Sequence, residues 1–387
     1  MTINFCLERD AARTEAAGVH FLHVFPSFGI GGVPLRIVRI INHLGSRCRH
    51  TIVALDGDFG AGARISRDVE CEFIAGKRAG TLSAIIKSGR YIAAVSPDVL
   101  LTYNWGSIEW ALANTFWCRR RHIHFESGFG VEEAFRQIWR RVVVRRLALQ
   151  AAEKVVVPSR TLEHVALETW RLPKDKLRYI PNGIEVAPLA GFGASAAPAD
   201  ATITVGTVAP LRAEKNVGRL IRAFARITSM PQLRLVIMGD GSERAKLEQL
   251  AADLGIAERV SFRGNVVVTP SVLHDELDIF CLSSDTEQMP NALLEAMAAG
   301  LPVAAVDVGD VRTMVAQENR EFIVPVTDPA ALANAIAVLA GDEKRRAAIG
   351  SLNRQRIVAE YALERMVAAY EALLLPQERA DWSNGHR

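Results

Sequence analysis

The sequence of 387 residues has few cysteines, no long apolar run and little net charge. No uncharged apolar segment reaches the roughly 18 residues that a membrane-spanning helix needs. The first eighteen residues carry three acids and no apolar core, so we expect no signal peptide. The five cysteines are scattered and form no C-x-x-C pair, so neither a disulfide framework nor a zinc site is indicated. A net charge of +3 without a recognised module predicts no nucleic-acid partner. We therefore expect a cytoplasmic protein.

Strand and helix patterns alternate almost throughout the chain. Such alternation predicts an α/β fold with parallel sheets and helices on both faces. The segment 186–200, rich in Ala, Gly and Pro, has little periodicity and is interpreted as a linker. We therefore predict two Rossmann-like, doubly wound domains that face a cleft, and a helical tail that starts at 344. Strands are expected in VHFLHVF, HTIVAL, PDVLLTY, HIHFE and KVVVPS before the linker, and in ITVGTV, LRLVIMG, RVSFRGN, DIFCLSS, PVAAVD and FIVPV after it.

Three glycine-containing loops join a predicted strand to a predicted helix. FGIGGVP holds Gly31 and Gly32 before a helix N-terminus, which suits an anion or a sugar as well as a plain tight turn. MGDGSE places Gly239 and Gly241 around an acid, and it is either a capped turn or a backbone contact to a base. APLRAEKN carries Arg212 and Lys215, which suit a diphosphate but are also common in surface loops.

Two further stretches allow competing interpretations. HIHFESGFG ends a strand with His124, a side chain that titrates near neutral pH but is often structural when it stands alone. The segment 134–149 has five arginines and no acid, so it is either a solvated helix face or a basic amphipathic helix for an anionic membrane. These arginines are Arg136, Arg140, Arg141, Arg145 and Arg146, and Arg119 to Arg121 lie shortly before them.

TEQMPNALLEAMAAG contains two carboxylates eight positions apart, Glu287 and Glu295. The first precedes a predicted helix and the second lies inside it, with Pro290 at the bend. Because a turn of helix and a loop separate them, we expect the two carboxylates to bind different parts of one ligand rather than to share a proton. No D-x-D metal motif stands out, and DVGD (307–310) is expected to cap the helix that follows it.

Taken together, GIGG, YIPNGIEV, VGTVAPLRAEKN, VIMGDGSE and TEQMPNALLEAMAAGLPVA resemble the family 4 retaining glycosyltransferases of the GT-B fold. The resemblance implies an acceptor-binding domain at 1–185, a nucleotide-sugar-binding domain at 201–359, and a last helix with the tail at 360–387 that crosses back to the first domain. It implies transfer of a sugar from a UDP- or GDP-sugar, without a metal or other cofactor, to a glycan or lipid-linked acceptor in cell-surface polysaccharide or lipopolysaccharide synthesis. Such a hexosyltransferase would be cytoplasmic or peripheral at the inner face of the membrane.

The same resemblance assigns roles to individual residues. His124, Arg212, Lys215 and Glu287 would be catalytic: the two cations would neutralise the departing diphosphate, and Glu287 would contact the donor sugar. Glu295 would hold the ribose. The other implied donor-binding residues are Gly31, Gly32, Asn182, Gly239, Gly241, Gln288, Met289, Pro290, Asn291 and Ala292.

The chain departs from the family pattern at three places. GGVP lacks the small residue and the glutamate that often follow the glycines, so the helix after it gives no firm inference about the acceptor. Pro210 stands where the family usually has an arginine, so Arg212 would have to reach the phosphate. Gln288 stands where glycine usually follows the first glutamate. Two other functions stay open on these grounds: a nucleotide-sugar 2-epimerase on the same fold, and a non-catalytic nucleotide-sugar-binding protein.

Overall fold

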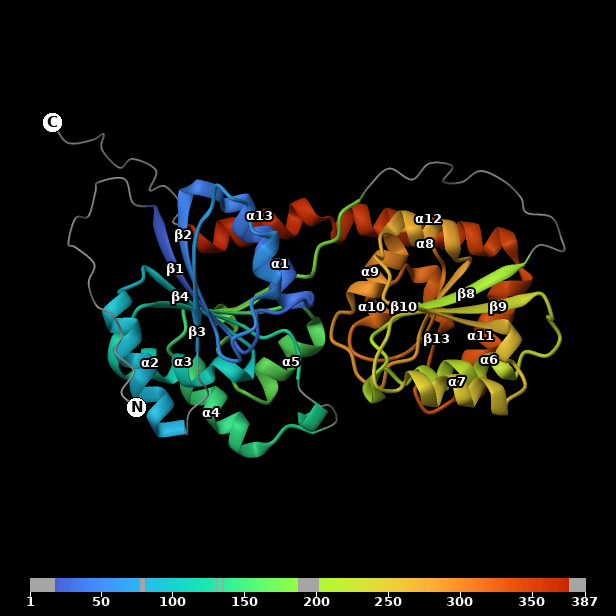
Figure 1. The fold of residues 1–387 in the computed structure, drawn as a ribbon, viewed down its shortest axis with the longest axis horizontal. Coiled ribbons are helices and arrows are strands. Elements are labelled where there is room, and N and C mark those ends of the chain that lie inside the picture. Colours follow the sequence, from blue (N-terminus) through green and yellow to red (C-terminus); the bar gives the residue numbers. More distant parts are fainter. Residues whose placement is uncertain (1–17, 77–80, 130, 134–135, 187–201, 376–387) are drawn as a thin grey trace. The chain divides into compact units, whose positions relative to one another are not determined.

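The computed structural model describes residues 18–76, 81–129, 131–133, 136–186 and 202–375. It contains two parallel sheets, of seven and six strands, each flanked by helices (Figure 1). This confirms the predicted fold class. The chain divides into two compact units, Met1–His124 with Ala151–Glu153 and Phe125–Gln150 with Lys154–Arg387. The domain bounds predicted from the sequence stay a prediction, and the predicted linker lies, except for Val186, outside the described residues.

The first sheet has the strand order β3-β2-β1-β4-β5-β6-β7. Its order reverses between β1 and β4: β2 and β3 are added on one side of β1, and β4 to β7 are added on its other side. Such a reversal point is where open α/β sheets bind ligands, beyond the carboxyl ends of the strands. The strands are β1 (Val19–Phe25), β2 (Cys48–Ala54), β3 (Glu70–Ala75), β4 (Val99–Tyr103), β5 (Arg121–Phe125), β6 (Lys154–Val157) and β7 (Leu177–Tyr179).

Alternating side chains of the central strands separate two packed layers in the first unit. Leu22 and Val24 of β1 pack with Leu100 of β4 against α2 and α3, where Ile92 and Trp110 cover them. The helix α1 lies on the opposite face of these strands (Figure 1). The helices that follow these strands are α1 (Gly32–Leu44), α2 (Thr81–Val95), α3 (Ile108–Ala113), α4 (Trp139–Leu149) and α5 (Arg160–Glu168).

The second sheet has the strand order β10-β9-β8-β11-β12-β13, and all six of its predicted strands are present. Its order reverses between β8 and β11, so this pair is the switch point of the second sheet. The strands are β8 (Ile203–Val208), β9 (Leu233–Met238), β10 (Val260–Gly264), β11 (Ile279–Leu282), β12 (Val303–Val306) and β13 (Ile323–Val324).

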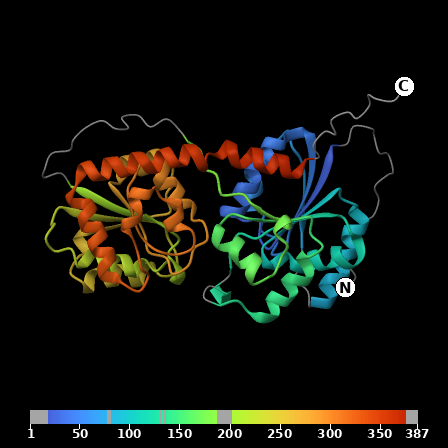
Figure 2. The same ribbon diagram turned by 180° about the vertical axis from the view of Figure 1, so that it is seen from behind.

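Two apolar layers cover the second sheet, one on each face (Figures 1 and 2). Helices α6, α7 and α11 contribute Phe224, Leu247 and Ile336 to one layer. Helices α8, α9, α10 and α12 form the other, with Leu293 and Met314 among its buried side chains. These helices are α6 (Val217–Ala225), α7 (Arg244–Asp253), α8 (Pro270–Glu276), α9 (Asn291–Ala298), α10 (Val311–Met314), α11 (Pro329–Gly341) and α12 (Glu343–Glu360).

The helical tail consists of two helices, and the second begins close to the start predicted for the last helix, at 360. The structure has α12 and then α13 (Leu363–Leu374), separated at Tyr361 and Ala362. The carbonyl of Tyr361 accepts a 2.9 Å hydrogen bond from the N–H of Ile184, and the carbonyl of Ile184 accepts one from the N–H of Leu363. This short strand-like pairing takes the place of helical bonds, which is the physical reason for the break.

Candidate functional site

Lys215 and Glu287 meet at the switch point of the second sheet. Lys215 follows β8 and Glu287 follows β11, and Nζ lies 2.6 Å from the carboxylate Oε1. Ser284 donates a second hydrogen bond of 2.7 Å to the same oxygen. Both side chains of the ion pair are largely shielded, with 23% and 12% of their surface exposed. Among the described residues no partner contacts Oε2 of Glu287, so this oxygen is available to accept a bond from a ligand hydroxyl.

A polar cluster beneath this pair fixes the loop that carries Lys215. Asn216 has left-handed backbone angles and caps α6 by accepting from the N–H of Arg219. Its amide nitrogen donates to Asp285, which also receives a 2.7 Å bond from Arg219. The hydroxyl of Ser283 donates to the Lys215 carbonyl. Because these bonds join the loops after β8 and β11, the ion pair is held in place by its neighbours.

The bend before α9 is braced from a distant part of the chain. Asn182 donates through its side-chain nitrogen to the Met289 carbonyl at 3.1 Å and to Oδ1 of Asn291 at 2.9 Å. Pro290 precedes the helix, and its carbonyl accepts first from the Leu293 N–H and then from the Leu294 N–H. The N–H groups of Asn291 and Ala292 lie ahead of these bonds, in the turn of a helix that attracts anions. Asn182, predicted as a donor contact, therefore orients this turn.

Gln288 links the same loop to the loop after β5 and to α5. The hydroxyl of Ser159 donates to Oε1 of Gln288 at 3.2 Å and accepts from the N–H of Leu162 as the cap of α5. A Cβ on Gly128 would lie 3.5 Å from the Gln288 side chain. This geometry directs the amide nitrogen of Gln288 away from Ser159. Among the described residues, no partner contacts that nitrogen.

Asp310 does not cap its own helix, contrary to the prediction for DVGD. Its carboxylate accepts from the N–H groups of Arg160 and Thr161 at 2.6 and 2.9 Å, and from the Thr161 hydroxyl at 2.7 Å. It therefore adds to the Ser159 cap at the N-terminus of α5, whose positive end favours a carboxylate more than the single turn of α10 does. Its own N–H donates to the Gln288 carbonyl. The sequence therefore indicated correctly that Asp310 binds a helix N-terminus, but it did not show that the helix is α5.

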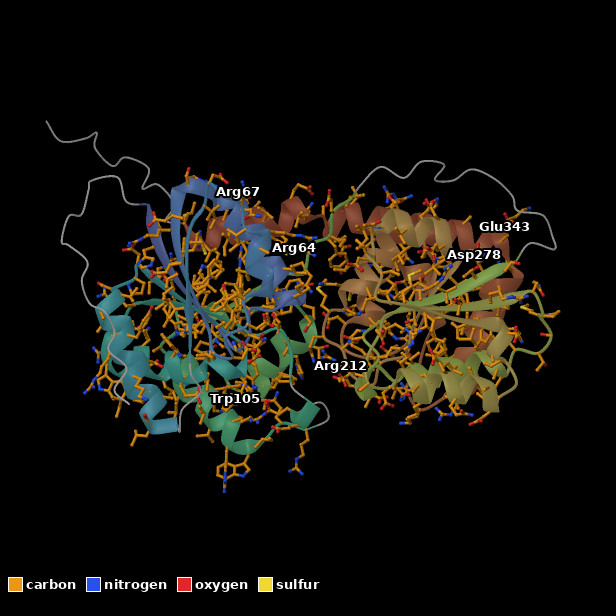
Figure 3. The ribbon with its side chains drawn as sticks, in the orientation of Figure 1. Arg64, Arg67, Trp105, Arg212, Asp278 and Glu343 are labelled. Carbon is orange, nitrogen blue, oxygen red and sulfur yellow. The ribbon has the colours of Figure 1, made fainter. Side chains whose placement is uncertain are left out.

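Gly239 and Gly241 are required by packing between two loops. A Cβ on Gly239, whose φ is +142°, would lie 1.9 Å from the Ala209 carbonyl oxygen, and one on Gly241 would lie 2.5 Å from that of Leu211. The turn is therefore a tight one, but it is not the predicted capped turn, because α7 has no side-chain cap; the donor role of the two glycines stays a prediction. Arg212 lies on the loop after β8 (Figure 3) and is exposed, with no ion pair to the residues that the structure describes.

The first unit has a cavity of about 260 Å³ at its own switch point. Residues from the ends of β1 and β4 and from the start of α1 line it, among them Gly32, Tyr103 and Asn104. Gly31 precedes α1 with extended backbone angles. His124, by contrast, is completely buried, and its Nδ1 lies 2.8 Å from the Thr102 hydroxyl. The structure therefore keeps Gly32 at a ligand-sized cavity and encloses the imidazole of His124, whose catalytic role stays a prediction.

The sequence predicts that five arginines of the segment 134–149 could face a membrane. The structure corrects this, because only two of them are exposed. Arg145 is buried, pairs with Glu133 at 2.9 Å and lies over the rings of Phe129 and Trp170. Arg141 also pairs with Glu133, and Arg146 donates to the Thr169 carbonyl. These contacts hold three of the five in the fold. Arg136 and Arg140 remain exposed.

No helix in the part of the chain that the structure describes is long and apolar enough to cross a membrane.

Two family models match consecutive parts of the chain. The model for Glycosyltransferase Family 4 matches residues 30–187, and the model for Glycosyl transferases group 1 matches residues 194–356. The chain therefore belongs to glycosyltransferase group 1, family 4, as the sequence motifs predicted.

Individual relatives agree with this family. The chain is 28% identical over 174 residues to N-acetyl-alpha-D-glucosaminyl L-malate synthase of Bacillus anthracis, which covers 45% of each protein. It is 30% identical over 177 residues to the lipopolysaccharide core biosynthesis glycosyltransferase LpsE of Rhizobium meliloti, covering 46% of this chain and 51% of LpsE. The chain thus spans about half the length of the curated relatives it matches. The structure of Anabaena HepE in complex with UDP aligns with 92% of this chain and 99% of its own, at a TM-score of 0.75 and 19% identity, and so shares the GT-B fold.

Proposed function

We propose that this protein is a metal-independent retaining glycosyltransferase that moves a hexose from a nucleoside diphosphate sugar to a glycan or lipid-linked acceptor. The observation that carries the proposal is the Lys215–Glu287 pair at the switch point of the second sheet. There a cation, a carboxylate oxygen available to a ligand and the first turn of α9 occur on neighbouring loops. A diphosphate needs cations and backbone N–H groups, and a sugar needs hydroxyl acceptors.

Each group has a distinct task in this proposal. Glu287 accepts from a sugar hydroxyl through Oε2, while Lys215 and Ser284 hold Oε1. Lys215, Arg212 and the N–H groups at the start of α9 stabilise the charge that grows on the diphosphate. Glu295, inside α9, binds the ribose hydroxyls. The amide nitrogen of Gln288 donates to a sugar oxygen, since the Ser159 hydroxyl occupies its other end.

The reaction breaks the bond between the anomeric carbon and the β-phosphate oxygen. The acceptor hydroxyl forms its new bond on the face that the diphosphate leaves, which retains the anomeric configuration. Its proton passes to an oxygen of the departing phosphate, so no separate base is needed. The electron pair of the broken bond stays with the diphosphate, whose negative charge the cations balance.

The name of one relative supports an acceptor from cell-surface synthesis. LpsE takes part in lipopolysaccharide core biosynthesis by its name, and HepE was solved with UDP. We therefore propose UDP-sugars as the first donors to test. A membrane-proximal acceptor fits the exposed arginines Arg136 and Arg140.

A thermal-shift screen with UDP-, GDP-, ADP- and CMP-sugars tests the donor class. A ligand at 100 times its dissociation constant adds about 2.7 kcal/mol of stability to the folded state. We expect one nucleotide to raise the melting temperature and the others to have no effect at equal concentration. No shift with any of the four would contradict the proposal.

Substitution at the ion pair tests the mechanism. We expect Lys215→Met to lower the rate of donor hydrolysis by about 10²–10³-fold, as does the loss of one group that stabilises a transition-state anion. Lys246→Met is the matched control, because Lys246 forms an exposed ion pair with Glu243 on α7. If the protein converts the donor to its epimer without an acceptor, the epimerase is favoured. If it binds the donor and no product forms, a non-catalytic binding protein is favoured.

A further inference from the structure

One surface of the first unit exposes large apolar side chains from two neighbouring elements. The elements are α2 and the short π-helix η4 (Asn114–Cys118). Large apolar side chains that gather in one exposed patch often mark a binding surface, whereas single ones are common. We call this surface the α2–η4 face. Its apolar members are Leu82, Ile86, Phe116 and Trp117, and their exposed fractions are 71%, 43%, 59% and 58%.

These side chains form one patch because the two elements are in contact. A Cβ on Gly89 of α2 would lie 3.5 Å from the Trp117 ring, and the Cys118 thiol donates to the Gly89 carbonyl. The rings of Phe116 and Trp117 are 6.1 Å apart. Leu82 and Ile86 lie one turn apart on α2, ahead of Gly89, on the face that helical periodicity exposes.

Every charged residue of α2, of η4 and of the two positions after η4 is a cation, and Glu72 of the edge strand β3 lies near Tyr91 of α2. Neither α2 nor η4 contains an acidic residue. The exposed cations that belong to the α2–η4 face are Lys87, Arg90, Arg119 and Arg120. Of these, Arg120 donates to the Ser96 hydroxyl, a neutral partner that leaves its charge uncompensated. The next arginine in the chain, Arg121, differs, because Glu153 neutralises it at 2.7 Å.

We propose that the α2–η4 face docks on an anionic phospholipid surface. Aromatic rings such as Trp117 prefer the interface between headgroups and acyl chains, and apolar residues such as Ile86 enter the acyl region. Unpaired arginines and lysines on the same side attract anionic headgroups. A protein partner of the same shape would require acids opposite four cations, whereas the membrane surface supplies negative charge everywhere.

This surface is separate from the segment that the sequence singled out. On α4, an apolar row of Trp139, Val143 and Leu147 is exposed. Among the described residues, two exposed arginines accompany it: Arg136 just before the helix, and Arg140, whose guanidinium lies 5.5 Å from the centre of the Trp139 ring. The α2–η4 face has twice as many cations. We therefore expect it to make the main contribution to membrane binding.

Co-sedimentation of the full chain with vesicles tests the proposal. The probes are vesicles of phosphatidylcholine with phosphatidylglycerol, and vesicles of phosphatidylcholine alone. We expect binding to the anionic vesicles that weakens at high salt. Lys87→Glu with Arg90→Glu should weaken it by at least about 30-fold, because each basic residue near such a surface contributes about a factor of five and a glutamate is repelled by it. Phe116→Ser with Trp117→Ser should weaken it while leaving the salt dependence in place.

Arg136→Glu with Arg140→Glu on α4 is the comparison variant. Unchanged or modestly weaker binding by this variant supports the α2–η4 face, and loss of binding by it alone overturns the proposal. So does a wild-type chain that ignores anionic vesicles, or a Phe116/Trp117 variant that binds them as before. A homo-oligomer that dissociates on substitution of Phe116 and Trp117 would assign the face to a second copy instead. The thermal shift with the donor shows that each variant is folded. Loss of that shift in the wild type would contradict the proposed function, whereas loss of vesicle binding would contradict only the membrane proposal.

Discussion

Acidification should destabilise the first unit, because histidines are buried in its central strands. Nε2 of His23 lies 3.0 Å from Nδ1 of His50, and Nδ1 of His23 lies 3.0 Å from the Tyr103 hydroxyl. Nε2 of His20 lies 2.9 Å from the Thr51 hydroxyl. Each imidazole must be neutral to avoid a buried charge.

Burial is the main cause of the lowered pKa values in this cluster. Burial, and then the charge of Arg49, lowers the pKa of His20 to about 4, although Asp98 opposes this. Burial and then His20 lower the pKa of His50 to about 4. Burial and then His124 lower the pKa of His122 to about 3. The pKa of His23 is lowered well below 6.5 by burial, then by His50 and His20.

The sign of the pH effect follows from which state binds more protons. Between pH 4 and pH 6.5 the unfolded chain holds protons on these histidines that the folded chain lacks. The free energy of unfolding is therefore highest above pH 6.5 and falls as the pH falls toward 4. From pH 7 to pH 5, a histidine with a pKa of 6.5 unfolded and about 4 folded loses about 2 kcal/mol of stability. For His20, His50 and His122 together the loss is about 6 kcal/mol.

Urea unfolding at pH 7 and pH 5 measures this loss, and His50→Asn provides the matched variant. An asparagine places its amide near the position of Nδ1 and keeps a hydrogen bond to His23, but it cannot take up a proton. We expect the pH-dependent loss to be smaller by about 2 kcal/mol in this variant. An NMR titration should find no protonation of these imidazoles above pH 5. Equal losses in variant and wild type, or a titration near pH 6.5, would refute the reasoning.

Three substitutions test how the second unit is held together. Asp310→Asn leaves an α5 N–H facing an amide nitrogen, and we expect a loss of about 1–3 kcal/mol in the urea-derived free energy of unfolding. Glu133→Ala removes the carboxylate 2.9 Å from the buried Arg145 guanidinium and leaves it, among the described residues, with that of Glu126 at 3.5 Å, so unfolding should become easier by about 1–3 kcal/mol; a loss below about 1 kcal/mol would contradict this. Gly239→Ala should destabilise more than its control Gly255→Ala, because both have positive φ but only Gly239 would place a Cβ against backbone; equal melting temperatures would disprove the packing argument.

The strands that the sequence predicts well are the ones that are apolar on both faces. Continuous apolar runs such as VAAV in β12 leave little alternative to a central parallel strand. β3 was missed because it lies at the sheet edge, where Glu70 and Glu72 point into solvent and no apolar run marks it. The contact that separates α12 from α13 was not predicted, because it depends on Ile184, far away in the chain. Local periodicity cannot contain such a contact.

The candidate site divides along the same line. Lys215 and Glu287 follow strands that become neighbours only through the order of the sheet, so their residue types were predictable but their 2.6 Å contact was not. Ser284 was overlooked, although its position three residues before Glu287 in SSDTEQ was a usable signal. The enclosure of His124 depends on Thr102 of the adjacent strand, which no local pattern could show.

The position of Glu287 depends on residues that carry no reactive group. Gly309 has a φ of +53°, and a Cβ there would lie 2.2 Å from the Glu287 carbonyl oxygen, so only glycine allows the two loops to approach this closely. The next residue, Asp310, donates its N–H to the Gln288 carbonyl and gives its carboxylate to the N-terminus of α5. The loop with Glu287 is thus bound by the DVGD turn through the Gln288 carbonyl and by Ser159 through the Gln288 side chain. Since a glycine at 288 would have no side chain to bond Ser159, we infer that Gln288 joins this loop to α5 as well as offering a donor to the sugar.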